Sequence, residues 1–255
     1  MGGLGNILFP LAYCYNLSIE KGLELVINYN HIGYIHTRAE RYKDGILKTF
    51  KTIETEDLAS FHTIKESDFV FSNNLLPVGK DIFLHGYFQS EKYFKTNKEK
   101  VRSLIISDEL NYKKAKKRYS ELVKQNQETV SIHIRRGNYL TLKDYHANLA
   151  PDYYYRGIEK INPKKVLVFS DDLNFCRETF SGPEFIFVHP EKDIQDMYLM
   201  SMCDNNIIAN STFSWWGAWL NQNPEKKVIA PEEWFGPKNA SMETCDIIPE
   251  QWIRM

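Results

Sequence analysis

The chain has few cysteines and no long apolar run, and each shortage excludes a class of protein. Its four cysteines are spread over 255 residues without a CxxC pair, which argues against a thiolate metal site and against a secreted fold stapled by disulfides. No segment approaches the roughly 20 apolar residues that a membrane span needs, and no charged leader precedes an apolar stretch at the N-terminus. We therefore expect reduced, mostly buried thiols in a cytoplasmic protein, and peripheral association with a membrane stays open.

Net charge is also nearly absent. The 32 lysines and arginines balance 33 aspartates and glutamates, so the formal net charge is -1 and no global positive field attracts nucleic acid. We expect no nucleic-acid partner, and any bound anion must be held by a local cluster. The chain does have a hydrophobic fraction of 43%, which is enough for a substantial core and excludes a disordered or collagen-like protein.

The second half of the chain alternates short apolar runs with helical patterns. The apolar runs cover residues 130–134, 166–169, 185–188, 206–209 and 227–230. The helical patterns between them cover residues 153–159, 174–180, 195–203 and 213–220. Buried strands that alternate with helices favour parallel βαβ units. We predict a Rossmann-like α/β domain over residues 127–255, a separate N-terminal domain over residues 1–126, and a hinge in the polar segment around residues 124–128.

The N-terminal half begins with a glycine-rich turn, residues 2–6, which leads into apolar residues at helical spacing. Such a turn usually connects a strand to a helix. No strand precedes it here, so we expect that the first strand of the N-terminal sheet is missing or that the sequence is truncated at its start. We expect strands at 23–27 and 82–85, and a basic helix within 91–118 whose lysines form a solvated face.

Polar clusters follow the first two apolar runs of the second half. Arg135 and Arg136 follow the first run, and Asp171 and Asp172 follow the second. The carboxyl ends of parallel strands share one edge of a sheet, where ligands bind. A guanidinium pair matches a phosphate, although a surface salt bridge explains it equally well. The aspartates can cap a helix, or one of them can accept hydrogen bonds from a nucleobase or ribose.

A third cluster follows the run at 206–209. The segment 210–214, Asn-Ser-Thr-Phe-Ser, enters a helix rich in tryptophan. Hydroxyl groups and free backbone N–H groups at a helix N-terminus can bind an anion, although simple capping is the alternative. We expect the tryptophans to pack in the core rather than against a sugar. Arginines, carboxylates and a hydroxyl-rich helix start at one sheet edge together suit a nucleoside diphosphate.

These segments resemble the motif set of the α-1,2-fucosyltransferases, glycosyltransferase family 11. The resemblance is carried by residues 2–6, 86–94, 133–137, 169–172 and 208–219. The last segment is the most specific, whereas the His-x-Arg-Arg element is shared with α-1,6- and protein O-fucosyltransferases. The chain departs from the family pattern at Ile7 and Asn138, where the family usually has Gln and Asp.

The resemblance implies a GT-B fold, in which two Rossmann-like domains face each other across a cleft. It also implies an inverting transfer of L-fucose from GDP-fucose to the 2-hydroxyl of a terminal galactoside, with no metal and no other cofactor. The expected partners are therefore GDP-fucose and a galactose-terminated oligosaccharide or glycolipid. The alternatives are another GDP-fucose transferase of the α-1,6 type, a catalytically silent nucleotide-sugar or glycan-binding protein, and a plain nucleotide-binding domain.

The resemblance also implies roles for individual residues. Arg135 would bind the donor diphosphate with support from Arg136, and His133 with one of Asp171 and Asp172 would bind the guanosine. The other implied contacts are a phosphate cradle of Ser211, Thr212 and Ser214, and a cleft lining of Gly5 and Asn6 opposite the fucose.

The chemistry agrees with a catalytic role for Arg135. Cleavage of the sugar–phosphate bond leaves negative charge on GDP, which fixed cationic groups stabilise. The chain has no Asp-x-Asp pair to hold a divalent ion, so we expect Arg135 to act in its place. The general base stays open among Asp144, His146, His85 and Glu91.

Overall fold

The computed structural model describes residues 3–29, 33–34, 37–55, 57–73, 77, 79–124 and 126–255. The chain divides into two compact units, one of Met1–Asp108 with Glu243–Pro249 and one of Glu109–Met242 with Glu250–Met255. The division precedes helix α3 (Glu109–Leu122), whereas the boundary predicted from the sequence follows it. Helix α3 belongs to the second unit because it packs on helix α6 (Asp193–Ser201).

The second unit contains a parallel sheet of six strands in the order β12-β11-β10-β7-β8-β9. The strands are β7 (Thr129–Ile134), β8 (Lys165–Ser170), β9 (Phe185–Phe187), β10 (Asn205–Ile207), β11 (Val228–Ala230) and β12 (Ile253–Arg254). The five apolar runs of the sequence thus form β7 to β11, and the Rossmann-like prediction is confirmed. In the register of the central strands, Ile132 of β7 lies between Val168 of β8 and Ile207 of β10.

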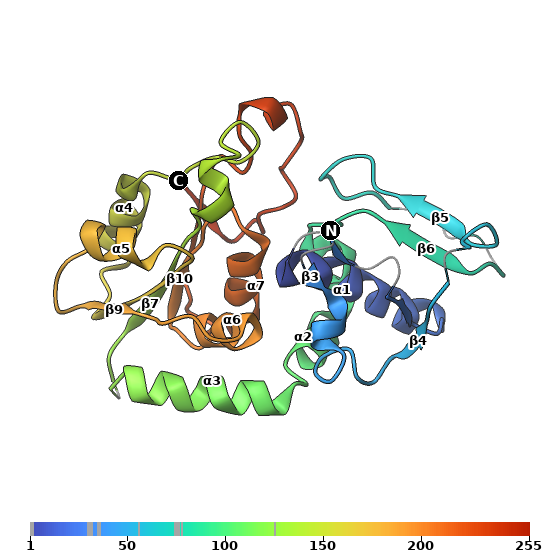
Figure 1. The fold of residues 1–255 in the computed structure, drawn as a ribbon, viewed down its shortest axis with the longest axis horizontal. Coiled ribbons are helices and arrows are strands. Elements are labelled where there is room, and N and C mark those ends of the chain that lie inside the picture. The colour runs from blue at the N-terminus through green and yellow to red at the C-terminus, as the bar shows by residue number, and fades with distance from the viewer. Residues whose placement is uncertain are drawn as a thin grey trace. The chain divides into compact units, whose positions relative to one another are not determined.

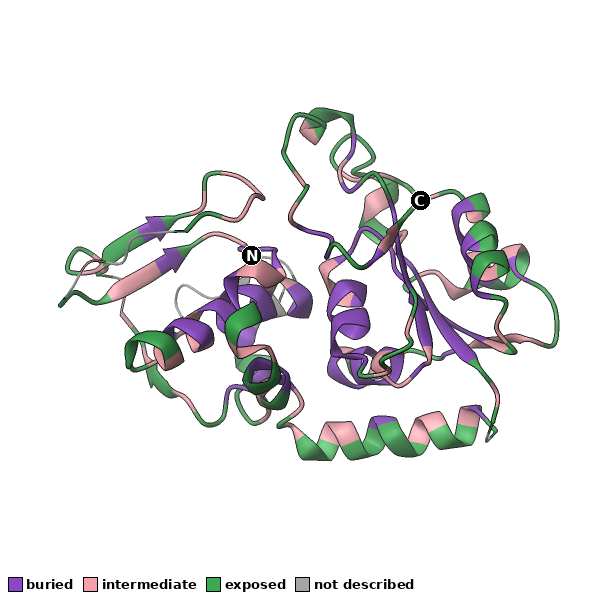
Figure 2. Cartoon of the chain, turned by 180° about the vertical axis from the view of Figure 1, so that it is seen from behind, coloured by how far each residue is buried: buried purple, intermediate pink, exposed green. Residues whose placement is uncertain are grey.

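Helices cover both faces of this sheet (Figure 1). Helices α4 (Pro151–Ile161) and α5 (Leu173–Thr179) lie on one face, and α6 and α7 (Thr212–Leu220) lie on the other. Strand β7 is buried at every position (Figure 2). Its polar residues Ser131 and His133, which alternate with apolar ones, are therefore buried as well. The tryptophans of α7 are at most 2% exposed, so the prediction that they pack in the core is confirmed.

The strand order creates a switch point at the middle of the sheet. Counted from β9 to β12, the order is 3-2-1-4-5-6, so the chain crosses in opposite directions on the two sides of the β7–β10 pair. In open α/β sheets, ligands bind outside the carboxyl ends of the strands at this point. The residues that follow β7 and β10 are therefore the first place to look for a site.

A buried amide network joins strands β7 and β10 to helix α6 and to the C-terminal end of helix α7. Asn206 Nδ2 donates to Ser131 Oγ at 2.7 Å and to the carbonyl of Met200 at 2.9 Å. Asn221 Nδ2 donates to Asn206 Oδ1 at 2.8 Å and to the carbonyl of Cys203 at 2.8 Å. Because Asn206 is 1% exposed, water cannot replace these partners.

Helix α3 carries the basic run of the sequence on its surface (Figure 2). Lys113 pairs with Glu109 at 3.0 Å, four residues away, and both side chains are largely exposed. Arg118 instead points toward helix α6, where its Nη1 contacts Asp196 at 2.6 Å. The solvated-face prediction is confirmed for Lys113, whereas Arg118 fastens the helix to α6.

The first unit is built around helix α1 (Leu4–Lys21), with Ile7, Leu8 and Phe9 fully buried. The strands described in this unit pair into two-stranded sheets, of which β1–β4 and β5–β6 are parallel and β2–β3 is antiparallel. The strands are β1 (Val26–Asn28), β2 (Gly33–Tyr34), β3 (Thr37–Arg38), β4 (Lys51–Ile53), β5 (His62–Lys65) and β6 (Ile82–His85), and helix α2 is Lys98–Ile105. The predicted strand at 82–85 is confirmed, and the one predicted at 23–27 begins later, at Val26.

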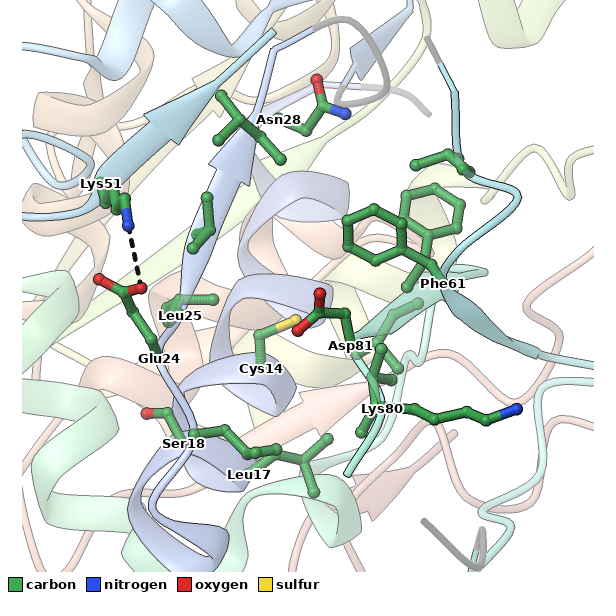
Figure 3. A pocket seen from close by; sticks show the side chains of 17 residues that line it. Cys14, Leu17, Ser18, Glu24, Leu25, Asn28, Lys51, Phe61, Lys80 and Asp81 are labelled. Atoms are coloured by element: carbon green, nitrogen blue, oxygen red, sulfur yellow. Dashed lines mark hydrogen bonds and ion pairs between the residues drawn. The ribbon is translucent and has the colours of Figure 1, made fainter. Parts of the chain in front are cut away.

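A cavity of about 380 Å³ lies in the first unit and is lined by α1, β1 and β6 (Figure 3). Cys14 of α1 and Asp81, directly before β6, are among its lining residues. Lys51 and Glu24 also line the cavity, and they pair at 3.2 Å. Burial raises the pKa of Cys14 to about 12, so its thiol stays protonated. None of the site residues predicted from the sequence lines this cavity.

The cysteines form no disulfide, in agreement with the expectation of free thiols. Cys176 and Cys203 are buried, Cys14 is partly buried and Cys245 is exposed. In the described part of the chain, no helix combines the length and the apolar character needed to cross a membrane.

Replacing Asn206 tests how much the amide network contributes to stability. Asn206→Leu removes the amide that donates to the hydroxyl of Ser131, and it removes one of the partners of the Asn221 amide and of the Met200 carbonyl. We expect the free energy of unfolding to fall by about 2–4 kcal/mol, because unpaired buried polar groups keep their full desolvation cost. Urea unfolding followed by circular dichroism measures this change.

Ser131→Ala is the matched control, because it removes a single hydrogen bond from the same network. We expect a loss of about 1 kcal/mol for this variant. A loss in Asn206→Leu no larger than that in Ser131→Ala would show that the network contributes little.

Candidate functional site

The arginines and aspartates predicted from the sequence meet at the carboxyl edge of the sheet. Arg135 and Arg136 follow β7 and lead into a 3₁₀ turn, Gly137–Leu140. Asp171 and Asp172 follow β8 and lead into α5. Parallel pairing of β7 with β8 places the two pairs side by side, in a cluster of two positive and two negative charges.

Arg135 is held at both ends of its guanidinium. Its Nη1 donates to Asp171 Oδ2 at 2.6 Å, and its Nη2 donates to Asn138 Oδ1 at 2.6 Å. The amide of Asn138 therefore orients Arg135, although the family usually has an aspartate at this position. The side chain of Arg135 is 34% exposed, and these two bonds leave other guanidinium N–H donors for an anion.

Arg136 turns toward α5 instead. Its Nε donates to Asp172 Oδ2 at 3.1 Å, and its guanidinium carbon lies 3.5 Å from the centroid of the Phe175 ring. Its backbone N–H donates to Asp171 Oδ1 at 2.9 Å. Asp171 thus contacts both arginines, whereas the side chain of Arg136 is fixed by an ion pair and a cation–π contact.

Asp172 caps helix α5. Its Oδ1 accepts a hydrogen bond from the backbone N–H of Phe175 at 3.1 Å. This hydrogen bond, together with the one from Arg136, lowers the pKa of the Asp172 carboxyl. The capping interpretation, which the sequence left open for both aspartates, therefore describes Asp172, while Asp171 serves the arginines.

His133 is buried in the same part of β7, with 7% of its surface exposed. Its Nδ1 has no hydrogen-bond partner among the described residues, and its ring meets that of Phe213 edge-on, with 5.5 Å between the centroids. Burial, and then the nearby Arg135, lower its pKa to about 4, so the ring is neutral at pH 7. A buried ring nitrogen without a partner is an exception in folded proteins and can be completed by a ligand.

Helix α7 begins at the neighbouring strand end, after β10. Ser211 occupies the N-cap position with its side chain free of a capping hydrogen bond, and it is 9% exposed. Thr212 is the first helical residue and is partly buried. Ser214 is buried, and its Oγ donates to the carbonyl of Ser211 at 3.2 Å. The positive end of the α7 dipole and the hydroxyl of Ser211 are therefore available to bind an anion at the switch point. The hydroxyl of Ser214, by contrast, bonds to the N-cap carbonyl of its own helix.

The sequence did not single out Tyr139 and Asn210 as separate functional residues, yet both connect the strand ends. The hydroxyl of Tyr139 donates to the carbonyl of Asn210 at 3.2 Å, which links the turn after β7 with the segment after β10. Asn210 lies within the segment 208–219 and Tyr139 lies two residues after the segment 133–137, but nothing in the sequence indicates that the two contact each other.

The remaining predicted residues lie in the first unit. Gly5 and Asn6 form the first turn of α1, and Asn6 Oδ1 accepts a hydrogen bond from Gln89 Nε2 at 3.2 Å. Two segments of the resemblance, 2–6 and 86–94, therefore meet within this unit, although Gly2 lies outside the described residues. Ile7 is fully buried, so the apolar residue at this position belongs to the core.

The candidates for a general base are also divided between the units. In the second unit, Asp144 pairs with Lys238 at 3.1 Å, and the ring of His146 stacks on that of Tyr139. His85 ends β6, and Glu91 begins a 3₁₀ turn, Glu91–Tyr93, in the first unit. Among the residues that the structure describes, no three His, Cys, Asp or Glu side chains gather in a way that could hold a metal ion.

Sequence comparison identifies two curated relatives from Escherichia coli. The O-antigen biosynthesis glycosyltransferase WbnK is 37% identical over 199 residues, which cover 72% of this chain and 65% of WbnK. The chain thus spans about two thirds of the length of this relative. An α-1,2-colitosyltransferase is 30% identical, and the match covers 100% of this chain and 96% of the relative.

Structural comparison finds the same fold in a solved fucosyltransferase. The α-1,6-fucosyltransferase NodZ, soaked with GDP-fucose, superposes with a TM-score of 0.53 over 86% of this chain and 89% of NodZ, at 14% identity. NodZ from Bradyrhizobium gives a TM-score of 0.52. The predicted GT-B-like α/β fold class with a parallel sheet is confirmed. The family model described as Glycosyl transferase family 11 matches residues 11–255. The chain therefore belongs to glycosyl transferase family 11.

Proposed function

We propose that this protein transfers L-fucose from GDP-fucose to the 2-hydroxyl of a terminal galactoside, with inversion and without a metal ion. The observation that carries the proposal is the grouping of Arg135, His133 and the start of α7 around the switch point of the sheet. Membership of a glycosyltransferase family supports sugar transfer as the reaction. The acceptor side is proposed for the first unit, and the donor side for the second.

Arg135 is proposed to grip the diphosphate of the donor. Negative charge grows on GDP as the bond to the sugar breaks, and a preoriented guanidinium stabilises it without reorganising. Asp171 and Asn138 supply that orientation, because each accepts a hydrogen bond of 2.6 Å from a different guanidinium nitrogen. This is the work that a divalent ion performs in other glycosyltransferases.

The nucleoside and the phosphates are assigned to the neighbouring groups. We propose that the guanosine forms a hydrogen bond with Nδ1 of His133, which has no partner among the described residues. Asp171 lies close enough to affect the pKa of His133, and we propose that its carboxylate also binds the guanosine. Ser211 and Thr212 at the start of α7 are proposed to hold the phosphates. Gly5 and Asn6 are proposed to line the acceptor side, and Asp172 and Ser214 to support α5 and α7.

A second candidate donor follows from one relative. The relative that covers the whole chain at 30% identity is named an α-1,2-colitosyltransferase, and colitose is fucose without its 3-hydroxyl. Transfer of colitose through the same α-1,2 linkage is therefore the alternative. The α-1,6 linkage is less favoured, because NodZ shares the fold at only 14% identity.

A donor screen with a product analysis tests the proposed function. We expect GDP and GDP-fucose to raise the melting temperature of the protein, and GDP-mannose and UDP-galactose to raise it less, because only a ligand that fits the folded state stabilises it. With a β-galactoside acceptor and excess EDTA, GDP-fucose should give an α-1,2-linked product, identified by NMR.

Other outcomes of the donor screen and the product analysis would lead to different conclusions. Binding of GDP-fucose without acceptor-dependent release of GDP would indicate a silent binding protein, and a preference for GDP-colitose would indicate the second donor. An activity that is lost in EDTA and restored by Mg²⁺ or Mn²⁺ would contradict the role given to Arg135.

Arg135→Lys tests the planar fork of the guanidinium separately from its charge. Lysine keeps the positive charge but cannot donate to Asp171 and Asn138 while also meeting a phosphate in a bidentate manner. The loss of a charge-assisted bond of about 2–3 kcal/mol predicts a kcat that is roughly 30–150-fold lower, with a smaller change in KM. Steady-state kinetics with GDP-fucose measures both constants.

Arg136→Lys is the matched control for this prediction. Its side chain is committed to Asp172 and Phe175, so we expect a smaller loss of turnover. Near-normal turnover in Arg135→Lys, or a larger defect in Arg136→Lys, would overturn the assignment of the catalytic arginine.

His133 should make stability depend on pH in a defined window. Its pKa is about 4 in the folded protein and about 6.5 in the unfolded chain, so the unfolded state binds more protons between these values. The free energy of unfolding should therefore fall by about 3 kcal/mol between pH 6.5 and pH 4. His133→Leu should remove this fall, as measured by urea unfolding across the range.

The same variant tests the proposed contact with the nucleotide. His133→Leu should weaken the binding of GDP in calorimetry, because the ring nitrogen can no longer meet the guanosine. His62→Leu, at an exposed position of β5, is the control and should change neither property. An unchanged pH slope together with unchanged GDP affinity would exclude His133 from the site.

A further inference from the structure

We propose that Tyr139 is a positioning residue for the transfer, which holds Arg135 in its working orientation through the face of its ring. The inference deepens the proposed function and rests on it. Tyr139 lies in the 3₁₀ turn, Gly137–Leu140, that follows Arg135 and Arg136.

Arg135 is supported from three directions, and Tyr139 supplies the third. Asp171 and Asn138 hold the two terminal nitrogens of the guanidinium. The guanidinium carbon also lies over the ring of Tyr139, 5.3 Å from its centroid. The hydrogen bonds to Asp171 and Asn138 fix the direction of the guanidinium group within its own plane. The ring of Tyr139 limits the movement of that group out of the plane. A cation–π contact of this kind also favours the charged group directly.

Tyr139 is itself fixed at several atoms. Its ring is stacked on that of His146, with 4.0 Å between the centroids and 5° between the planes. Its carbonyl accepts a hydrogen bond from Asn148 Nδ2 at 3.3 Å. Its hydroxyl donates to the carbonyl of Asn210 at 3.2 Å, and burial raises the pKa of Tyr139, so the phenol keeps its proton.

Asn210 anchors this arrangement to the sheet. It follows β10 and is 3% exposed. Its Nδ2 donates to the carbonyl of Ala147 at 2.9 Å and to the carbonyl of Trp234 at 2.9 Å. One buried amide therefore joins the segments that follow β7, β10 and β11, and its own carbonyl receives Tyr139. The orientation of Arg135 is in this way connected to the segment that starts α7.

The expected benefit is in turnover rather than in binding. Arg135 has a long side chain that is 34% exposed, and it would otherwise lose conformational freedom when the reaction proceeds. A guanidinium that is already in place meets the growing charge without reorganising, and such an effect acts on kcat.

Two substitutions at Tyr139 separate the ring from the hydroxyl. Tyr139→Leu removes the ring and should lower kcat about 10-fold, with the KM for GDP-fucose changed less than about twofold. Tyr139→Phe keeps the ring and loses only the hydrogen bond to Asn210, so it should retain most of the turnover. Tyr155→Phe is the matched control, because the hydroxyl of this half-exposed tyrosine donates to Thr179 away from the site, and it should behave as the wild type.

A double-mutant cycle decides whether Tyr139 acts through Arg135. In the Arg135→Lys background, Tyr139→Leu should change kcat by less than about twofold, because the planar group that the ring supports is already gone. Additive losses in the double variant would overturn the inference, as would a Tyr139→Leu variant that changes KM and leaves kcat intact.

The failure of the proposed function gives a different result. A wild-type protein that transfers no sugar from GDP-fucose or GDP-colitose overturns the function. In that case the same double-mutant cycle is measured by the free energy of unfolding of the protein without nucleotide. Non-additive losses would support the contact between Arg135 and Tyr139, and additive losses would overturn the inference.

Discussion

Two guanidinium groups at the end of a buried parallel strand must meet negative charge, and this requirement organises the second unit. Strand β7 is buried along its whole length and delivers Arg135 and Arg136 to the edge of the sheet. Strand β8 runs parallel beside it and delivers Asp171 and Asp172 to the same edge. The ligand-free cluster is therefore neutral, since each arginine has one carboxylate as its ion-pair partner. Partly exposed pairs of this kind add little stability, so their value lies in orientation.

Close packing at this edge restricts the sequence around the arginines. An ideal Cβ at Gly137 would lie 2.4 Å from Asp171 Oδ2, so any side chain there would push the carboxylate away from Arg135. A similar restriction holds between α6 and α7, where a Cβ at Gly217 would lie 2.9 Å from the Cβ of Met200. These glycines allow the close approaches on which the positions of Arg135 and of α7 depend.

The sequence could predict most of the second unit, because its strands are apolar runs and each helix between them has a regular pattern. It could not predict which aspartate caps α5, since Asp171 and Asp172 are adjacent and both suit an N-cap. Only the structure shows that Asp172 meets the N–H of Phe175. The strands β4, β5 and β12 were not predicted, because each contains a single apolar residue among polar or charged ones and so forms no apolar run. The contact between Tyr139 and Asn210 joins residues 71 positions apart, which a pattern along a single sequence cannot reveal.

The neutrality of the cluster bears on how the site can distinguish a ground state from a transition state. A site with a large positive excess would attract a nucleotide strongly before reaction, and that uniform attraction does not accelerate the chemical step. Here the formal charge of Arg135 is already balanced by Asp171, so net charge contributes little to the first binding of an anion. The helix dipole of α7 and the directed N–H groups of Arg135 remain. Directed hydrogen bonds strengthen as charge collects on the oxygen they contact, so in the proposed reaction they would favour the leaving group over the intact donor. A carboxylate beside the arginine that we propose as catalytic is in this sense compatible with anion chemistry, because it fixes the direction of the guanidinium group and limits attraction that would serve binding alone.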